Sequence, residues 1–153
     1  MNEQPKIGND LYVRDHDERV LCHKCVDACG EQWQNTFAIA VAGRGFDARV
    51  STGHGAALPD PACVFCGNPI GVGPAGALPF STEFGMRAAR AWDEPAQTRT
   101  TTVRASCGAG RDVTLQARDN EIAKVTSPHT GPAPHGNLCI KGRFGYRHVQ
   151  NRD

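Results

Sequence analysis

Aromatic side chains and long apolar stretches are scarce in this sequence of 153 residues. Aromatic residues make up 7% of the chain, which also contains 17 glycines and 10 prolines. Large apolar side chains supply most of the burial free energy of a domain, so a turn-rich chain that has few of them commonly depends on metal ions or disulfides. The composition therefore favours two or three small cross-linked modules over one large hydrophobic core.

What the sequence lacks also excludes several kinds of partner. No stretch approaches the roughly 18 consecutive apolar residues of a membrane-spanning helix. Acidic and basic residues are interspersed, with a formal net charge of +1, so there is no basic stripe for nucleic-acid binding. The first ten residues contain no apolar segment of a secretory signal. We therefore expect no membrane span, no nucleic-acid partner and a cytoplasmic location.

Cysteine is the residue type whose spacing indicates chemistry. The chain has 7 cysteines, an odd number, with two close CxxC pairs, and both features favour metal binding in a reducing compartment over disulfides. No grouping of Ser, His and Asp and no pair of carboxylates indicates catalysis, so we assign no catalytic residue. The candidate metal ligands are Cys22, Cys25, Cys29, Cys63, Cys66, Cys107 and Cys139.

Stretches rich in proline and glycine divide the chain into three modules. Residues 1–80 contain both dense cysteine groups, a strand-like FAIAVAG segment and a turn at GRGFDARV. Residues 81–97 predict a linking helix. Residues 98–153 contain the strand-like segments TRTTTVRAS, DVTLQARDN and EIAKVTS, which predict a small antiparallel sheet.

Local signals refine these predictions. Ser81 or Thr82 is a candidate helix N-cap, and Pro95 sets the limit of the linking helix. The dipeptide Asp119-Asn120 predicts a hairpin turn. The apolar residues of the first module that we expect in the core are Phe37, Ile39, Val41 and Phe46.

The two dense cysteine groups partly match the run C-x2-C-x2-C-x3-C-P of bacterial two-cluster ferredoxins. In that run, three thiolates hold one cluster and the fourth holds the other. In the first group, the four ligand places fall on Arg19, Cys22, Cys25 and Cys29. In the second group, they fall on Cys63, Cys66, Pro69 and Gly73.

Longer stretches around these cysteines resemble a known family. LCHKCVDACGEQWQNTFAIAVAGRGFDARV and CVFCGNPIGVGPAGALPFSTE resemble the ferredoxin-like region of formate dehydrogenase alpha subunits and of the related large iron–sulfur subunit of respiratory complex I. TTVRASCGAGRDVTLQARDNEIAKV and GNLCIKGRFGY resemble the 4Fe-4S domain that opens molybdopterin oxidoreductases, whose pattern is C-x2-C-x3-C followed by G-x-L-C-x-K-G. The resemblance covers about residues 11–150. It implies an α+β fold with a ferredoxin-like two-cluster module, a linking helix and a small antiparallel sheet.

The resemblance implies three cluster sites, and each of them lacks at least one thiolate. Arginine has no lone pair to donate to iron, so it cannot replace a cysteine ligand. The first site retains two thiolates and is expected to be lost; its places are Arg19, Cys22, Cys25 and Gly73. The second retains three, enough for a three-iron cluster or for a four-iron cluster with an outside ligand; its places are Cys29, Cys63, Cys66 and Pro69. The third retains two and is expected to hold no cubane; its places are Arg104, Cys107, Arg111 and Cys139.

The function that the resemblance implies is electron transfer within a formate dehydrogenase-like oxidoreductase, between a molybdopterin site and NAD- or flavin-dependent subunits. The chain would not be catalytic alone, because the pterin-binding domains lie beyond its C-terminus in the family, and it would bind no molybdopterin by itself. Lys141 matches the family's lysine between cluster and pterin.

Three alternatives remain open. The CxxC pairs resemble a zinc ribbon, to which His23 could add a ligand, in a cluster-poor assembly or interaction module without redox activity. Cys107 and Cys139 could instead be free thiols or a redox-labile pair. The chain could also be a truncated or decaying reading frame.

Overall fold

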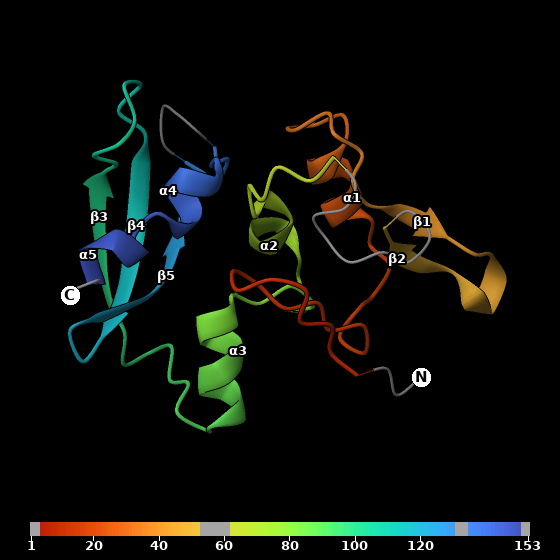
Figure 1. The fold of residues 1–153 in the computed structure, drawn as a ribbon, viewed down its shortest axis with the longest axis horizontal. Helices are drawn as coiled ribbons and strands as arrows, with labels where there is room; N and C mark the ends of the chain where they lie inside the picture. The colour runs from red at the N-terminus through yellow and green to blue at the C-terminus, as the bar shows by residue number, and fades with distance from the viewer. Residues whose placement is uncertain (1–3, 53–61, 131–134, 151–153) are drawn as a thin grey trace.

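Two antiparallel sheets lie at opposite ends of the molecule, with short helices between them (Figure 1). The computed structural model describes residues 4–52, 62–130 and 135–150. Strands β1 and β2 form the smaller sheet, and strands β3, β4 and β5 form the larger one in that order. This arrangement of helices and antiparallel sheets confirms the α+β fold class predicted from the sequence.

The N-terminal half carries its cysteines on two short helices that lie against each other, α1 (Lys24–Cys29) and α2 (Asn68–Val72). Each helix follows a residue in the left-handed region, His23 with φ 62° and Gly67 with φ 66°. Between the helices, β1 (Ala40–Ala42) and β2 (Arg49–Ser51) form a hairpin whose turn contains a 3-10 helix, η1 (Gly45–Asp47). The turn predicted at GRGFDARV is therefore present.

The core prediction for this half was mostly wrong. Ile39 is buried, whereas Phe37, Val41 and Phe46 are exposed, Phe46 completely. The cause is that the three-residue strands of the β1–β2 hairpin project away from the helices (Figure 1). Most of this two-stranded ribbon has no second layer to cover it, so Val41 and Phe46 stay exposed, whereas Val50 of β2 packs into the hydrophobic cluster. Phe37 precedes the hairpin. The hydrophobic cluster of this half is instead made by Tyr12, Cys29, Ala38, Ile39, Val50, Phe80 and Phe144.

The linking helix α3 (Ser81–Ala88) begins where it was predicted but ends well before Pro95. Phe80, not Ser81 or Thr82, occupies the N-cap position. At the other end, Arg90 adopts φ 55°. The N–H groups of Arg90 and Ala91 donate to the carbonyl oxygens of Arg87 and Met86 at 3.0 and 2.8 Å. This is a Schellman motif, which stops the helix through backbone geometry. Arg90 takes the left-handed position that glycine usually occupies.

The prediction of a small antiparallel sheet in the C-terminal half is confirmed. β3 (Thr98–Val103), β4 (Asp112–Arg118) and β5 (Glu121–Thr126) form a meander. Asp119 and Asn120 both have positive φ, as the hairpin turn requires. The short helices α4 (Ile140–Phe144) and α5 (Arg147–Gln150) follow the sheet. Its core is formed by Val113, Val125, Leu138 and Tyr146.

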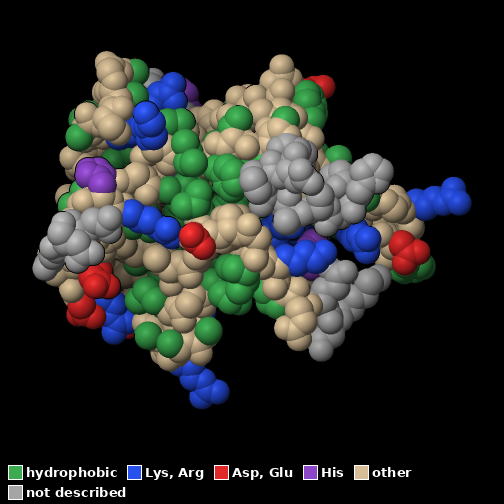
Figure 2. Space-filling model, viewed as in Figure 1, with side chains coloured by type: hydrophobic (Ala, Val, Ile, Leu, Met, Phe, Trp, Pro, Cys, Tyr) green, Lys and Arg blue, Asp and Glu red, His purple; other side chains and the backbone are tan. Residues whose placement is uncertain are grey.

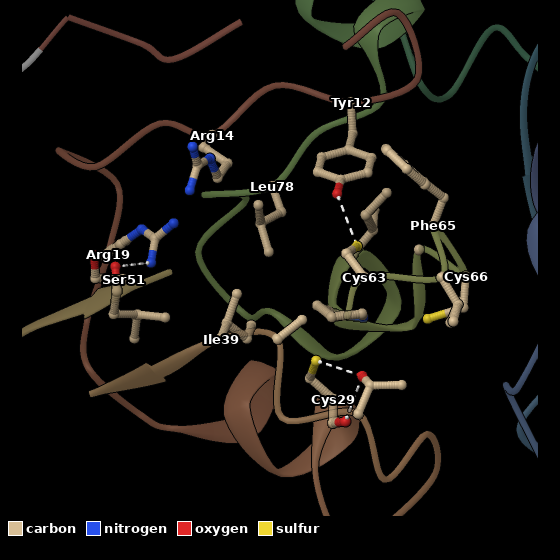
Figure 3. A pocket seen from close by; sticks show the side chains of 17 residues that line it. Tyr12, Arg14, Arg19, Cys29, Ile39, Ser51, Cys63, Phe65, Cys66 and Leu78 are labelled. Carbon is tan, nitrogen blue, oxygen red and sulfur yellow. Dashed lines mark hydrogen bonds between the residues drawn. The ribbon is translucent and has the colours of Figure 1, made fainter. Parts of the chain in front are cut away.

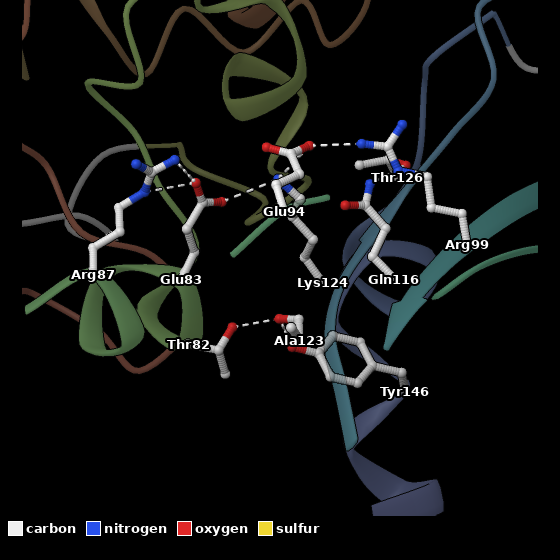
Figure 4. A network of polar contacts seen from close by, with 10 residues as sticks. All are labelled: Thr82, Glu83, Arg87, Glu94, Arg99, Gln116, Ala123, Lys124, Thr126 and Tyr146. Carbon is white, nitrogen blue, oxygen red and sulfur yellow. Dashed lines mark hydrogen bonds and ion pairs between the residues drawn. The ribbon is translucent and has the colours of Figure 1, made fainter. Parts of the chain in front are cut away.

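A partly buried polar network attaches α3 to the sheet (Figure 4). Lys124 of β5 places Nζ 3.3 Å from a carboxylate oxygen of Glu83, whose other oxygen lies 2.6 Å from Arg87. The indole of Trp92 lies against both cations, 4.8 Å from Lys124 and 5.3 Å from Arg87. These contacts join α3, β5 and the segment that follows α3. They therefore hold α3 in a fixed orientation against the sheet.

Figure 2 shows lysine and arginine side chains scattered over the visible face, without a continuous stripe. In the described ranges, no helix has the length and apolar character that crossing a bilayer demands.

Candidate functional site

Three of the predicted ligands line one pocket (Figure 3). Cys29 is the last residue of α1, and Cys63 and Cys66 lie in the segment that leads into α2. Cys29 and Cys66 are each 7% exposed. The three cysteines line a pocket of about 40 Å³, whose walls also include Ile39, Leu78 and other apolar side chains. Residues far apart in the sequence therefore present three thiols to one enclosed volume.

Backbone conformation accounts for this convergence. Phe65 adopts φ 51° and Gly67 φ 66°, so the chain turns sharply on both sides of Cys66. A side chain at Gly67 is excluded, because its Cβ would clash with Cδ of Arg143. The loop that holds Cys63 and Cys66 is therefore shaped by one glycine and by a side chain from the other half of the molecule.

Burial controls the protonation of the Cys66 thiol. Burial raises the pKa of Cys66, and the charges that Cys29 and Cys63 would carry raise it further, against the opposing effects of the Asn68 N–H group and Arg143. The Asn68 N–H group lies 3.5 Å from the Cys66 sulfur. The Cys66 thiol is thus protonated at neutral pH in the metal-free chain, and its binding to iron as a thiolate releases a proton.

Two hydroxyl groups face sulfur atoms in this pocket. Tyr12 Oη lies 3.7 Å from the Cys63 sulfur, and Thr36 Oγ1 lies 3.4 Å from the Cys29 sulfur. Burial, followed by the nearby Cys63, raises the pKa of Tyr12 far above its usual value. The phenol therefore stays protonated and is able to donate a hydrogen bond to a thiolate at position 63.

The donor set of this pocket fits a polynuclear cluster better than a single ion. Pro69, at the fourth ligand place, lines the pocket but offers no donor atom. Over the described residues, no group of three or more His, Cys, Asp or Glu side chains is close enough to hold one metal ion. In a cluster, each thiolate binds a different iron, so the sulfurs need not meet at one point. Cys29, Cys63 and Cys66 line one pocket without meeting at one point.

The first predicted site forms a second pocket. Its four places, Arg19, Cys22, Cys25 and Gly73, all line a cavity of about 40 Å³. Burial raises the pKa of Cys25, Arg19 lowers it and Cys22 raises it. Arg19 Nη1 also donates to the Val50 carbonyl oxygen at 2.9 Å. Each of the two pockets thus collects residues from both cysteine groups, but this one contains only two thiols.

The two CxxC pairs lie in separate pockets, which bears on the prediction of a zinc site. Cys22 and Cys25 line one pocket, and Cys63 and Cys66 line the other. A four-cysteine zinc site requires all four sulfurs within about 2.3 Å of one ion. The two pairs do not form such a site in this structure, and His23 is exposed.

The residues at the four ligand positions of the third predicted site do not fit a cubane cluster; they are Arg104, Cys107, Arg111 and Cys139. Arg104 Nη1 donates to the Cys139 sulfur at 3.0 Å. Partial burial raises the pKa of Cys139, but the Gly142 N–H group, Arg104 and the Lys141 N–H group lower it by more, so the net shift is downward. The pKa of Cys107 is lowered by the N–H groups of Ala109 and Arg111. Lys141 itself is exposed on α4.

The residues that join the two halves of the molecule were not predicted from the sequence. Arg143 is 1% exposed and Asn68 is fully buried. Asn68 Oδ1 accepts from the Leu138 N–H group at 3.0 Å and from Arg143 at 3.1 Å. Burial lowers the pKa of Arg143 to about 10, which leaves it charged at neutral pH. A lone arginine or asparagine has no periodic signal that would mark it as buried, and neither has Tyr12.

Comparison with known proteins agrees with this organisation. Residues 97–151 match the family model of the molybdopterin oxidoreductase Fe4S4 domain. This match and the similar proteins described next confirm the resemblance seen in the sequence to molybdopterin oxidoreductase Fe4S4 domains, to formate dehydrogenases and to a subunit of NADH-quinone oxidoreductase.

Similar proteins come from several bacteria. The NADPH-Fe(3+) oxidoreductase subunit alpha of Geobacter sulfurreducens is 35% identical over 99% of this chain and 17% of its own length. A subunit of the NADH-quinone oxidoreductase of Rhizobium meliloti is 34% identical over 88% of this chain and 15% of its own length. A protein provisionally named a formate dehydrogenase in Staphylococcus haemolyticus is 27% identical over 92% of this chain and 18% of its own length. The chain spans less than a fifth of each of these relatives.

Proposed function

We propose that this chain binds one iron–sulfur cluster through Cys29, Cys63 and Cys66 and relays electrons within a formate dehydrogenase-like oxidoreductase. The supporting observation is that three buried or half-buried thiols from two separate segments line one apolar pocket. The electrons would pass between a molybdopterin site and NAD- or flavin-dependent subunits. A bound cluster supplies one-electron redox chemistry there.

The residues of the pocket have distinct roles in this proposal. Cys29, Cys63 and Cys66 bind iron as thiolates, and the apolar walls exclude water. Tyr12 and the Asn68 N–H group donate hydrogen bonds toward sulfur, which stabilises the more negative, reduced state. The place of Pro69 leaves one iron without a protein ligand, or gives a cluster of three irons.

Partner subunits and a reducing compartment belong to the same proposal. Two relatives are named as subunits of larger oxidoreductases, which supports assembly with other chains. All seven cysteines carry free thiols, which supports a cytoplasmic location. We propose that exposed Lys141 on α4 faces the molybdopterin-binding part of the complex, next to Cys139.

Anaerobic reconstitution with iron and sulfide tests this function. We expect a brown chain with broad absorbance near about 400 nm that contains about three to four irons and as many sulfides. Dithionite should bleach the absorbance, and ferricyanide should restore it. A chain that contains two or three cubanes, or an iron-loaded chain that cannot be reduced and reoxidised, contradicts the proposal.

A second candidate is a cluster-poor assembly or interaction module, with zinc or without metal. It is favoured by Arg19 and Arg104, whose guanidinium groups lie beside thiols at two of the three sites. A colourless anaerobic preparation that contains zinc but no sulfide would support this candidate and exclude the first.

A further inference from the structure

We propose that Arg104 replaces the third cluster as a structural cross-link, so that the Fe4S4 domain of this chain folds and closes without iron. In the family pattern, Arg104 stands at a thiolate place, and here its guanidinium nitrogen contacts the sulfur of Cys139, a surviving cysteine of the same site. A hydrogen bond between guanidinium and sulfur thus takes the position of an iron–sulfur bond.

The geometry shows that this contact joins two segments that a cluster would otherwise join. Arg104 directly follows β3, and Cys139 directly precedes α4. Arg104 Nε also donates to Ser106 Oγ at 3.2 Å, which fixes the orientation of the guanidinium. The side chain lies so close to α4 that a Cβ at Gly142 would be 3.0 Å from Nη1 and 3.4 Å from Cδ of Arg104.

The loop of residues 104–111, which contains three of the four ligand positions of the third site, is also closed by its own backbone. The Arg104 N–H group donates to the Arg111 carbonyl oxygen at 3.0 Å, so the two arginines at thiolate places lie at the paired ends of the loop. Within the loop, the Gly110 N–H group donates to the Cys107 carbonyl oxygen at 3.0 Å. The conformation of the loop therefore needs no metal ion to bring its ends together.

The hydrophobic core of this domain is independent of the cross-link. Val113, Val125, Leu138 and Tyr146 pack between the sheet and the C-terminal helices, and Arg104 is not among them. Loss of the Arg104 side chain should loosen the loop without unfolding the domain, so variants at this position remain informative.

Hydrogen exchange of the full chain without iron tests the cross-link. In Arg104→Ala, we expect amide exchange in residues 104–111 and 139–143 to become about threefold to fivefold faster. This factor corresponds to the free energy that one exposed charged contact contributes to local stability. Arg99→Ala is the matched control, because Arg99 lies in β3 and forms an exposed ion pair with Glu94. Unchanged exchange in Arg104→Ala overturns the proposal.

Iron content provides an independent test. Cys107→Ala and Cys139→Ala should reconstitute with the same amount of iron as the unmodified chain. The double variant Arg104→Cys, Arg111→Cys restores four cysteines and should gain about four irons and four sulfides. Iron lost in either alanine variant, or no iron gained in the double variant, contradicts the claim that the arginines exclude a cluster. These results do not depend on whether the pocket of Cys29 binds one.

Discussion

Arg143 Nε lies 3.0 Å from the carbonyl oxygen of Cys66, although the two residues belong to opposite halves of the molecule. The same guanidinium donates to Asn68 Oδ1 at 3.1 Å and to the Gly136 carbonyl oxygen at 3.2 Å. Arg143 thus satisfies three buried acceptors at once and fixes the loop that carries Cys66 against α4. The candidate cluster pocket therefore depends on a residue of the neighbouring Fe4S4 domain.

Replacement of Arg143 should destabilise the whole chain. Arg143→Ala leaves the Cys66, Asn68 and Gly136 oxygens without this donor, and we expect the free energy of unfolding to fall by about 3 kcal/mol or more. Urea unfolding followed by circular dichroism measures the change. Arg44→Ala, at an exposed position in the turn of the β1–β2 hairpin, is the control and should alter stability by less than about 0.5 kcal/mol. Equal effects of the two variants would show that Arg143 does not join the halves.

Replacement of Tyr12 should change the reduction potential of the bound cluster but not its iron content. Tyr12→Phe removes the hydroxyl that lies 3.7 Å from the Cys63 sulfur. Loss of one hydrogen bond of about 1 kcal/mol should lower the potential of a one-electron couple by roughly 40 mV. Tyr146→Phe loses a hydroxyl bonded to the Ala123 carbonyl oxygen instead and should leave the potential unchanged. A potential that is the same in both variants would rule out tuning by Tyr12.

The thiols of the metal-free chain should differ in their pH dependence of alkylation. The thiolate is the reactive form, and the pKa is lowered at Cys107 and Cys139 but raised by burial at Cys25 and Cys66. At neutral pH, Cys107 and Cys139 should therefore react first with iodoacetamide. Their rates should level off below the usual thiol pKa, whereas the rates of Cys25 and Cys66 should still rise above it. Mass spectrometry of the digested chain measures each site, and equal profiles for all four would contradict these assignments.

The C-terminal sheet was predictable because its signals are local. The strand-like segments and the Asp119-Asn120 turn predicted β4 and β5, and the structure contains both strands with both turn residues at positive φ. The end of α3 was not predictable in this way. Its Schellman motif places Arg90, rather than glycine, in the left-handed region, and Pro95 was the only visible stop signal.

The candidate site was predictable only as far as the cysteine spacing carries information. Spacing and resemblance grouped Cys29 with Cys63 and Cys66, and the structure places these three in one pocket. Iron binding by these cysteines is still a prediction. The supports of the pocket were not predictable, because Tyr12 and Arg143 reach it from segments distant in sequence, and nothing in the sequence marks Asn68, two residues after Cys66, as buried. Exposed Phe46 shows the opposite failure, since an apolar residue in a short hairpin has no layer to cover it.

Iron and sulfide analysis of single cysteine variants tests the central claim most directly. After anaerobic reconstitution, Cys29→Ala, Cys63→Ala and Cys66→Ala should each lose most of the bound iron, because each removes one of three ligands in the same pocket. Cys22→Ala, Cys25→Ala, Cys107→Ala and Cys139→Ala should keep the iron content of the unmodified chain. Full iron content in Cys29→Ala would contradict the account, because it would show that the two cysteine groups do not share a cluster.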